Sequence, residues 1–152
     1  MRLANVEEVI SAWKVLDAVG RPELKFSILR EDERKMNLIT GLIKSMPNYN
    51  EKNNEVVARE LEKLIDRLPR VYYNEGNPNN GMYAFDEIVI KGDDTITLRS
   101  HGFIRDNDSE YIKNIQDTVY TIGRNMKADE HSVSVNKYAY SMREIIIKLW
   151  WD

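Results

Sequence analysis

Residues 87–99 read Glu-Ile-Val-Ile-Lys-Gly-Asp-Asp-Thr-Ile-Thr-Leu-Arg, a pattern that predicts a β-hairpin together with its register. Apolar and polar residues alternate on both sides of the turn, as in two strands that each bury one face. A three-residue loop, Gly92 to Asp94, places apolar residues opposite apolar residues, whereas a two-residue loop would mix the faces. We therefore predict the three-residue loop. The resulting pairs are Lys91–Thr95, Ile90–Ile96, Val89–Thr97, Ile88–Leu98 and the opposite charges Glu87–Arg99.

Further strand patterns lie on either side of this hairpin. Residues 23–29 alternate in the same way, and Val133 with Val135 indicates a short strand. Residues 137–151 are apolar on both faces, which is typical of a strand that lies inside its sheet and is covered on both sides. We therefore expect the last strand to be central in the sheet.

Four segments carry the helical repeat of apolar residues, namely 5–19, 31–46, 54–68 and 107–127. Capping boxes open the first and the last of these segments, because a glutamate stands three residues after an asparagine in both. Together the patterns predict one domain, residues 1–152, of the α+β class. Its sheet is expected to be mostly antiparallel, with four to five strands and with helices on one side.

The composition restricts the classes of function. The 152 residues are 42% apolar and 31% charged with a net charge of −3, which is ordinary for a globular domain. So balanced a charge gives no general attraction to nucleic acid or anionic membranes. The absence of cysteine excludes disulfides, zinc–thiolate sites and a thiol nucleophile. Residues 1–14 are amphipathic and acidic, unlike a signal peptide, and no apolar stretch has the length of a membrane span. We expect a cytoplasmic protein without a membrane partner.

The order helix, strand, helix, helix and two-stranded wing between residues 5 and 104 resembles that of winged-helix proteins. Residues 56–68, Val-Val-Ala-Arg-Glu-Leu-Glu-Lys-Leu-Ile-Asp-Arg-Leu, are similar to the recognition helices of that class. The resemblance implies DNA binding through the third helix. Like charges at helical spacing repel each other, and a phosphate backbone would relieve that repulsion. Interspersed acids are also typical of a plain solvated helix. The candidate nucleic-acid-binding residues are Arg59, Lys63, Arg67 and Arg70.

Acidic residues do not form a convincing metal site. The run Asp106, Asp108, Glu110 resembles the start of a calcium loop, but Tyr111 stands where that loop needs glycine, so helix capping explains the acids better. Adjacent carboxylates in the hairpin region could belong to a metal-dependent nuclease, yet neighbours on a strand point to opposite faces. Residues 23–25, Glu-Leu-Lys, match only part of a restriction-type nuclease motif.

The two histidines, His101 and His131, do not begin a two-histidine phosphodiesterase motif, and they lack the helical spacing of a metal pair. No nucleophile elbow or phosphate-binding glycine loop is present. We therefore predict no catalytic residue, no metal and no cofactor.

Aromatic residues are the remaining candidates. Tyrosines bracket residues 74–81, Asn-Glu-Gly-Asn-Pro-Asn-Asn-Gly, which predict an exposed loop, and two tryptophans stand at residues 150 and 151. Tyrosine and tryptophan are favoured anchors of protein interfaces, although they also fill α+β cores. The candidate partner-binding residues are Tyr72, Tyr73, Tyr83, Trp150 and Trp151.

These observations favour a small non-enzymatic binding protein that occupies a macromolecular, most of all a protein, partner. Inhibitors, immunity proteins and regulators from mobile elements act in this way. The first alternative is a winged-helix-like DNA-binding protein, whose affinity would fall steeply with salt. The second alternative is a metal-dependent nuclease or phosphodiesterase, which a divalent ion would stimulate.

Overall fold

The computed structural model describes residues 6–20, 22–27, 33–48, 50–68, 71–72, 81–82, 87–103, 108–137 and 142–152. The predicted helices and the strand predicted over 23–29 are confirmed to within a few residues at their ends. The strand predicted over 137–151 begins later, at Met142, and Lys137 belongs to the preceding strand. The helices are α1 (Val6–Val19), α2 (Glu33–Ser45), α3 (Asn54–Arg67) and α4 (Asp108–Asn125). The strands are β1 (Glu23–Ser27), β2 (Val71–Tyr72), β3 (Gly81–Met82), β4 (Glu87–Lys91), β5 (Thr95–Phe103), β6 (Glu130–Lys137) and β7 (Met142–Trp150).

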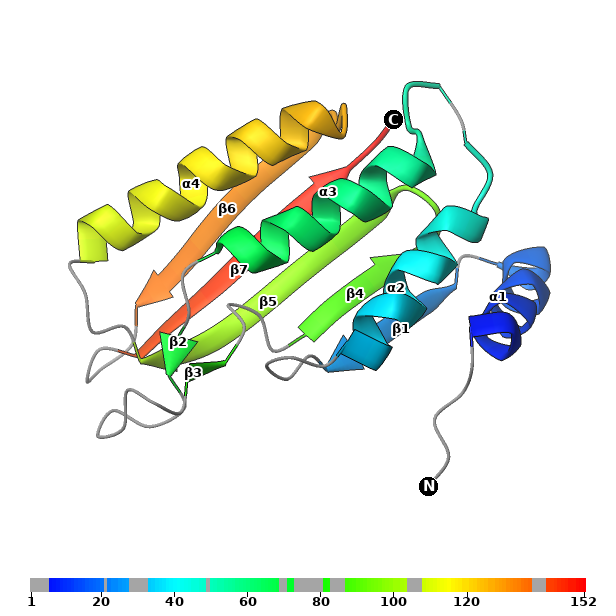
Figure 1. Ribbon diagram of the computed structural model, residues 1–152, viewed down its shortest axis with the longest axis horizontal. Helices are drawn as coiled ribbons and strands as arrows, with labels where there is room; N and C mark the ends of the chain where they lie inside the picture. Colours follow the sequence, from blue (N-terminus) through cyan, green and yellow to red (C-terminus); the bar gives the residue numbers. More distant parts are fainter. Residues whose placement is uncertain are drawn as a thin grey trace.

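The sheet is antiparallel throughout its described pairs. Its main part has the order β1-β4-β5-β7-β6, so β7 lies inside the sheet, as predicted, and β6 is an edge strand (Figure 1). The short strands β2 and β3 pair with each other and join the end of β5, where Tyr72 lies opposite Phe103. The predicted α+β class, with helices on one side of an antiparallel sheet, is confirmed.

The hairpin register is confirmed pair by pair, from Glu87 opposite Arg99 to Lys91 opposite Thr95. The ion pair that forms there was not predicted. Arg99 donates hydrogen bonds of 2.9 and 2.7 Å to Glu144 on β7, because β7 lies along the other side of β5. A strand from the end of the sequence thus supplies the carboxylate.

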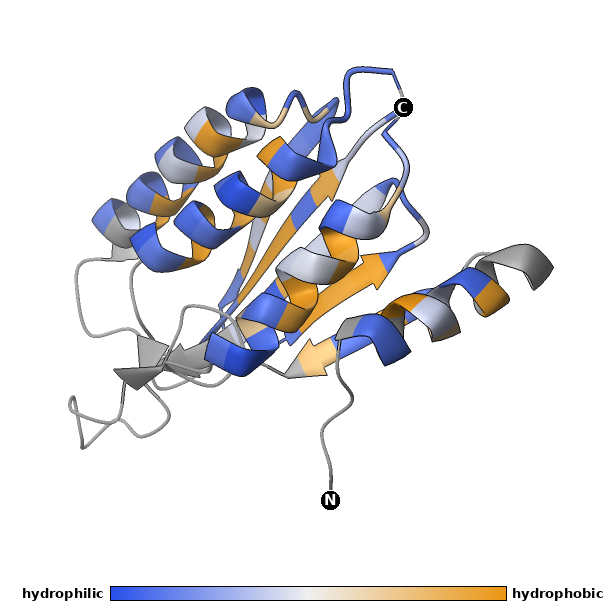
Figure 2. Cartoon of the chain, turned by 45° about the vertical axis from the view of Figure 1, so that its right-hand side comes forward, coloured by the Kyte–Doolittle hydropathy of each residue, from blue (hydrophilic) through white to orange (hydrophobic). Residues whose placement is uncertain are grey.

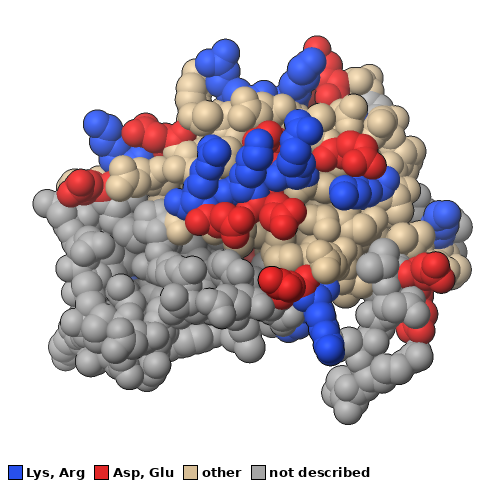
Figure 3. Space-filling view, in the orientation of Figure 1, with Lys and Arg blue, Asp and Glu red and all other residues tan. Residues whose placement is uncertain are grey.

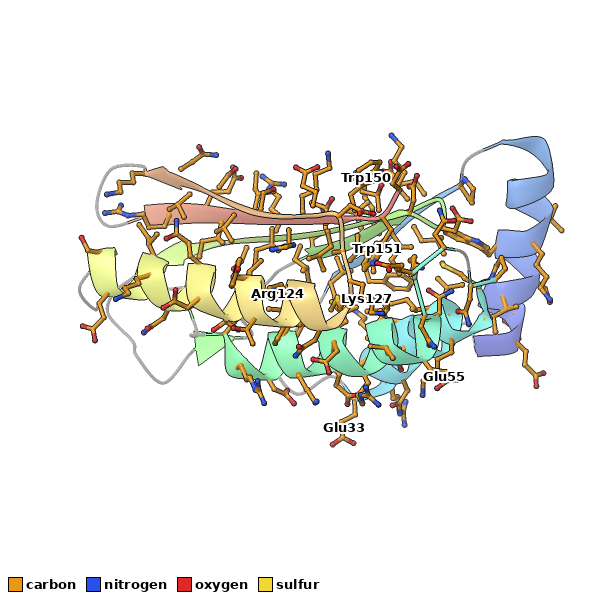
Figure 4. All side chains as sticks on the ribbon, turned by 90° about the horizontal axis from the view of Figure 1, so that it is seen from above. Glu33, Glu55, Arg124, Lys127, Trp150 and Trp151 are labelled. Atoms are coloured by element: carbon orange, nitrogen blue, oxygen red, sulfur yellow. The ribbon has the colours of Figure 1, made fainter. Side chains whose placement is uncertain are left out.

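The helices α2, α3 and α4 form one layer over one face of the sheet, and apolar residues meet between the two layers (Figure 2). Leu61 and Leu64 of α3 are fully buried against Ile88, Leu98 and Ile147 of the sheet in one hydrophobic cluster. Trp13 of α1 joins the same cluster at its margin. Among the described elements no helix covers the other face of the sheet, so the predicted cover on both sides of β7 is not found there (Figure 4).

The resemblance to winged-helix proteins extends to the order of elements only. The hairpin β4–β5 does not project as a wing, because β5 pairs along its whole length with β7 in the middle of the sheet. Helix α3 packs between α2 and α4 and buries its apolar stripe on the sheet (Figure 1). Its outward side is therefore one part of a broad helical surface and not the tip of a protruding element.

Helix α4 approaches β6 at a point where only glycine fits. A Cβ atom built on Gly123 would lie 2.6 Å from both Cβ and Cγ of His131, closer than carbon atoms tolerate. We expect Gly123→Ala to lower the free energy of unfolding by about 1–3 kcal/mol, because the clash outweighs the better helix propensity of alanine. Urea unfolding measures the change. Gly20→Ala is the matched control, since nothing lies within 4 Å of its added carbon. Equal stability of the two variants would contradict the close contact of α4 with β6.

Candidate functional site

The side of the sheet opposite the helices, which we call the outer face, carries several partly exposed apolar residues. Trp150 points away from the helical layer, whereas Trp151 points into it (Figure 4). Trp150 lies opposite Thr95 of β5 and Glu130 of β6. Ile146, four residues before Trp150 on β7, and Val89 on β4 are also partly exposed on this face. The period of two residues along a strand places all three on one side of the sheet.

Several bases and acids on the outer face are paired with each other. Arg99 and Glu144 are 2.7 Å apart, and Asn136 donates a 3.0 Å hydrogen bond to the same carboxylate. Lys148 lies 3.7 Å from Glu130, and Lys25 lies 3.9 Å from Glu23. An incoming phosphate would have to compete with a carboxylate at each of these bases. The outer face is consequently mixed in character: aromatic and aliphatic groups stand among threonines and internally matched charges.

Trp151 is part of the hydrophobic core, with an exposed fraction of 2%. Its indole Nε1–H donates a 3.0 Å hydrogen bond to the carbonyl of Met126, at the end of α4. Its backbone N–H donates a 3.0 Å bond to the carbonyl of Asp94 in the β4–β5 turn. Trp151 is therefore not accessible to a partner that binds at Trp150.

Lys52 is buried beside this tryptophan, with an exposed fraction of 3%. Its ammonium nitrogen lies 5.2 Å from the centre of the Trp151 ring and donates a hydrogen bond to the side chain of Asn54. Burial lowers the pKa of Lys52 from 10.5 to about 8, although the nearby carboxylate of Asp93 acts in the opposite direction. A buried amine with a lowered pKa is unusual, and such groups are enriched at functional sites.

A cavity of about 220 Å³ adjoins Lys52, and we call it the C-terminal pocket. The last residues of the chain close it: Asn50 donates to the carbonyl of Asp152 at 2.8 Å, and Asp152 donates its N–H to Asp129 at 2.7 Å. Two of its residues, Asn50 and Lys127, have left-handed backbone conformations with φ of 49° and 56°. The lining residues are Asn50, Glu51, Lys52, Lys127, Asp129, Trp151 and Asp152. Three carboxylates against two ammonium groups make this pocket a poor receptor for an anion.

The candidate nucleic-acid-binding residues of α3 are exposed and form a row, which we call the α3 basic row: Arg59, Lys63 and Arg67 (Figure 3). Arg70 lies outside the described residues. A buried carboxylate lies beneath the row, since Glu60 is 5% exposed and accepts a 3.2 Å bond from Lys63. The Arg59 Nε atom is 3.8 Å from the same oxygen, and Asn125 of α4 contacts the other oxygen at 3.4 Å. Part of the positive charge of the row is therefore already neutralised within the protein.

Two grooves run beside the α3 basic row, between α2 and α3; the first is acidic, and the second has as many bases as acids in its lining. One groove of about 240 Å³ is lined by Glu33, Met36, Asn37, Glu62, Ile65 and Asp66. A second, of about 250 Å³, is lined by Thr40, Lys44, Glu55, Ala58, Arg59 and Glu62. Red side chains stand directly beside the blue row in Figure 3. A phosphate backbone that followed the row would pass close to these carboxylates, which disfavours it.

The remaining candidates are described only in part. Tyr73 and Tyr83 lie outside the described residues, and of Tyr72 only the backbone is described, in β2. Most of the predicted loop 74–81 is likewise outside. His131 packs against Tyr120 with ring centres 5.7 Å apart, as a structural histidine would. In the part of the chain that the structure describes, no three histidine or acidic side chains gather as a metal site, and no helix is long and apolar enough to cross a membrane.

The sequence did not predict the burial of Lys52 or the exposure of Tyr120. Lys52 lies in the connection 47–54, whose polar composition indicated exposure, and its burial depends on Trp151, some hundred residues away. Tyr120 is 56% exposed, the largest exposed fraction among the aromatic side chains that the structure describes. It flanks the apolar stripe of α4, where its ring packs against His131 of β6. Its position outside that stripe could have identified Tyr120 as an exposed aromatic.

Comparisons of this chain with protein-family models, with curated proteins and with solved structures find no match. The function is consequently argued from the geometry of the chain itself.

Proposed function

We propose that this chain is a small non-enzymatic binding protein that acts by occupying a protein partner, and that the outer face is its binding surface. The observation that carries the proposal is the position of Trp150. It is partly exposed on a face that no described helix covers, whereas the adjacent Trp151 is buried in the core. Tryptophan is among the residues that contribute most to protein interfaces.

The neighbours of Trp150 support a protein partner. Ile146 and Val89 add apolar area, and Thr95 and Thr97 between them can exchange hydrogen bonds with a partner. Threonines and rigid β-sheet lose little conformational entropy when they are covered, which favours association. The matched charges at the margin fit the polar rim that surrounds most protein interfaces. In this proposal the protein works in the cytoplasm, as an inhibitor, an immunity protein or a regulator from a mobile element would.

A second candidate function, DNA binding, rests on the α3 basic row. The exposure of Arg59, Lys63 and Arg67 at successive turns of α3 favours contact with phosphates. The buried Glu60 and the acidic groove lined by Glu33, Glu62 and Asp66 act against it. The outer face therefore remains the better supported binding surface.

Capture experiments distinguish the two surfaces. Tagged wild-type protein is used to capture partners from a nuclease-treated lysate of the source organism, alongside Trp150→Ala and the double variant Arg59→Glu, Lys63→Glu. We expect a protein that the wild type and the α3 variant retain equally and that Trp150→Ala binds at least about tenfold more weakly. Thermal unfolding of each variant checks that its fold is intact.

The opposite result would identify the α3 basic row as the binding surface. If Trp150→Ala retains every partner while the α3 variant loses nucleic acid from an untreated lysate, the DNA-binding function replaces the one proposed here. A steep fall of that affinity with salt would accompany this result.

A further inference from the structure

Strand β6 forms an edge of the described sheet. It pairs with β7 along Glu130 to Lys137, and no described strand pairs with its other side. Natural proteins usually protect such an edge with proline, a bulge or inward-pointing charges, because unpaired N–H and C=O groups accept another strand. The eight residues Glu-His-Ser-Val-Ser-Val-Asn-Lys contain no proline, and the described pairing with β7 runs without a bulge. A charged residue stands only at each end.

Apolar groups lie along this edge. Val133 and Val135 point to the helical side of β6 and are only partly covered by the core. The exposed ring of Tyr120 on α4 packs against His131 of β6, and Arg124 lies over the ring at 5.5 Å. A strand added beside β6 would cover the two valines and approach the tyrosine. Association with another strand would therefore bury the apolar surface that is exposed along β6.

The sequence of β6 is complementary to itself. In an antiparallel pair of identical strands, residues of the same face must lie opposite each other if both helical layers are to stay on one side. Centring the two-fold axis on Val133 satisfies this rule. The opposite pairs are then Val133–Val133, His131–Val135, Ser132–Ser134, Glu130–Asn136 and Asp129–Lys137.

This register matches opposite charges and keeps apolar residues together. Asp129 of each copy faces Lys137 of the other, so the pair of opposite charges occurs twice. Centring the axis on Ser134 would instead place His131, and not an acidic residue, opposite Lys137. Opposite charges across a strand pair stabilise it and like charges destabilise it.

We propose that two copies of this chain associate through β6, antiparallel about a two-fold axis at Val133, so that their sheets become one. This inference uses the backbone edge of β6, whereas the proposed function uses the side chains of the outer face, and it is independent of that function. Backbone hydrogen bonds along β6 supply the affinity, as in other cases of strand addition. The helices α4 of the two copies flank the junction.

Light scattering coupled to size exclusion tests the association on the full chain over a roughly hundredfold range of concentration. We expect twice the monomer mass of 17.8 kDa. Lys137→Glu should weaken the dimer by about tenfold, because like charges then face each other at both ends. Lys25→Glu is the matched control, since it makes the same exchange on β1, at the opposite edge of the described sheet.

A single introduced cysteine tests the register, since the chain has none of its own. Val133→Cys places two thiols opposite each other across the axis, where strand pairs bring Cα atoms to about 4.5–5.5 Å, within disulfide range. We expect mild oxidation to link this variant into a covalent dimer and to leave Val89→Cys, on the outer face, unlinked. A native chain that stays monomeric throughout overturns the proposal. So does a native dimer whose Val133→Cys variant fails to cross-link.

Discussion

Trp151→Ala is expected to lower the free energy of unfolding by about 3–5 kcal/mol, the usual cost of truncating a buried tryptophan. The side chain fills the core between the end of β7 and α4, and its N–H satisfies the carbonyl of Met126. Its removal would leave a cavity and an unpaired carbonyl, and it would also expose the ammonium group of Lys52. Urea unfolding followed by circular dichroism measures the loss.

Trp150→Ala is the matched control for this prediction. It removes the same side chain one residue earlier, but from the outer face, so we expect a loss of only about 1 kcal/mol. Similar losses for the two variants would show that the alternation of faces at the end of β7 is wrong. A large loss at Trp151 alone would leave Trp150 as the tryptophan that a partner can reach.

Lys52→Met is expected to change how stability depends on pH. In the folded protein the pKa of Lys52 is about 8, against 10.5 for an unperturbed lysine. Between these values the unfolded chain binds a proton that the folded chain does not, so the free energy of unfolding rises with pH. Below about pH 8 both states are protonated and the cost of burying the charge is fully present. The rise across the window is on the order of 3 kcal/mol.

Methionine keeps most of the length of the side chain and cannot ionise. Subtracting the stability of Lys52→Met from that of the wild type therefore isolates the lysine from other groups that titrate between pH 7 and pH 10.5. We expect this difference to shift in favour of the wild type as the pH rises, measured by urea unfolding at each pH. Lys25→Met, at a side chain that is 61% exposed, controls for the loss of one positive charge. Parallel profiles for the wild type and Lys52→Met would exclude a buried ammonium group.

Local patterns predicted the register of the hairpin because it depends only on residues 87–99. Which side of β7 turns inward could not be predicted in the same way. Both faces of that strand are apolar, so Trp150 and Trp151 were equal candidates until the helical layer was placed. The choice between them depends on where α3 and α4 pack. That packing cannot be predicted from any short stretch of sequence.

The candidate site shows the same limit more strongly. Glu87 was the carboxylate predicted opposite Arg99, and it does lie opposite, but Glu144 binds the guanidinium from a strand 45 residues later in the sequence. Lys52 was assigned to a polar connection, and only its distant neighbours explain why it is buried. Interactions between residues far apart in the sequence thus account for most of what was missed.

The position of β7 between β5 and β6 has a consequence for folding during synthesis on the ribosome. Strand β5 is complete at Phe103, yet its principal neighbour ends at Trp150, so nearly fifty further residues must be made before the two can pair. At typical rates of synthesis, about 5–20 residues per second, this delay is roughly 2–10 seconds. Throughout it, one backbone edge of β5 lacks the strand that later pairs with it, and β6, complete only at Lys137, lacks the same strand for the last part of the delay. The nascent chain therefore passes through a stage at which a chaperone, or a neighbouring nascent copy, can bind a strand before the chain's own β7 exists.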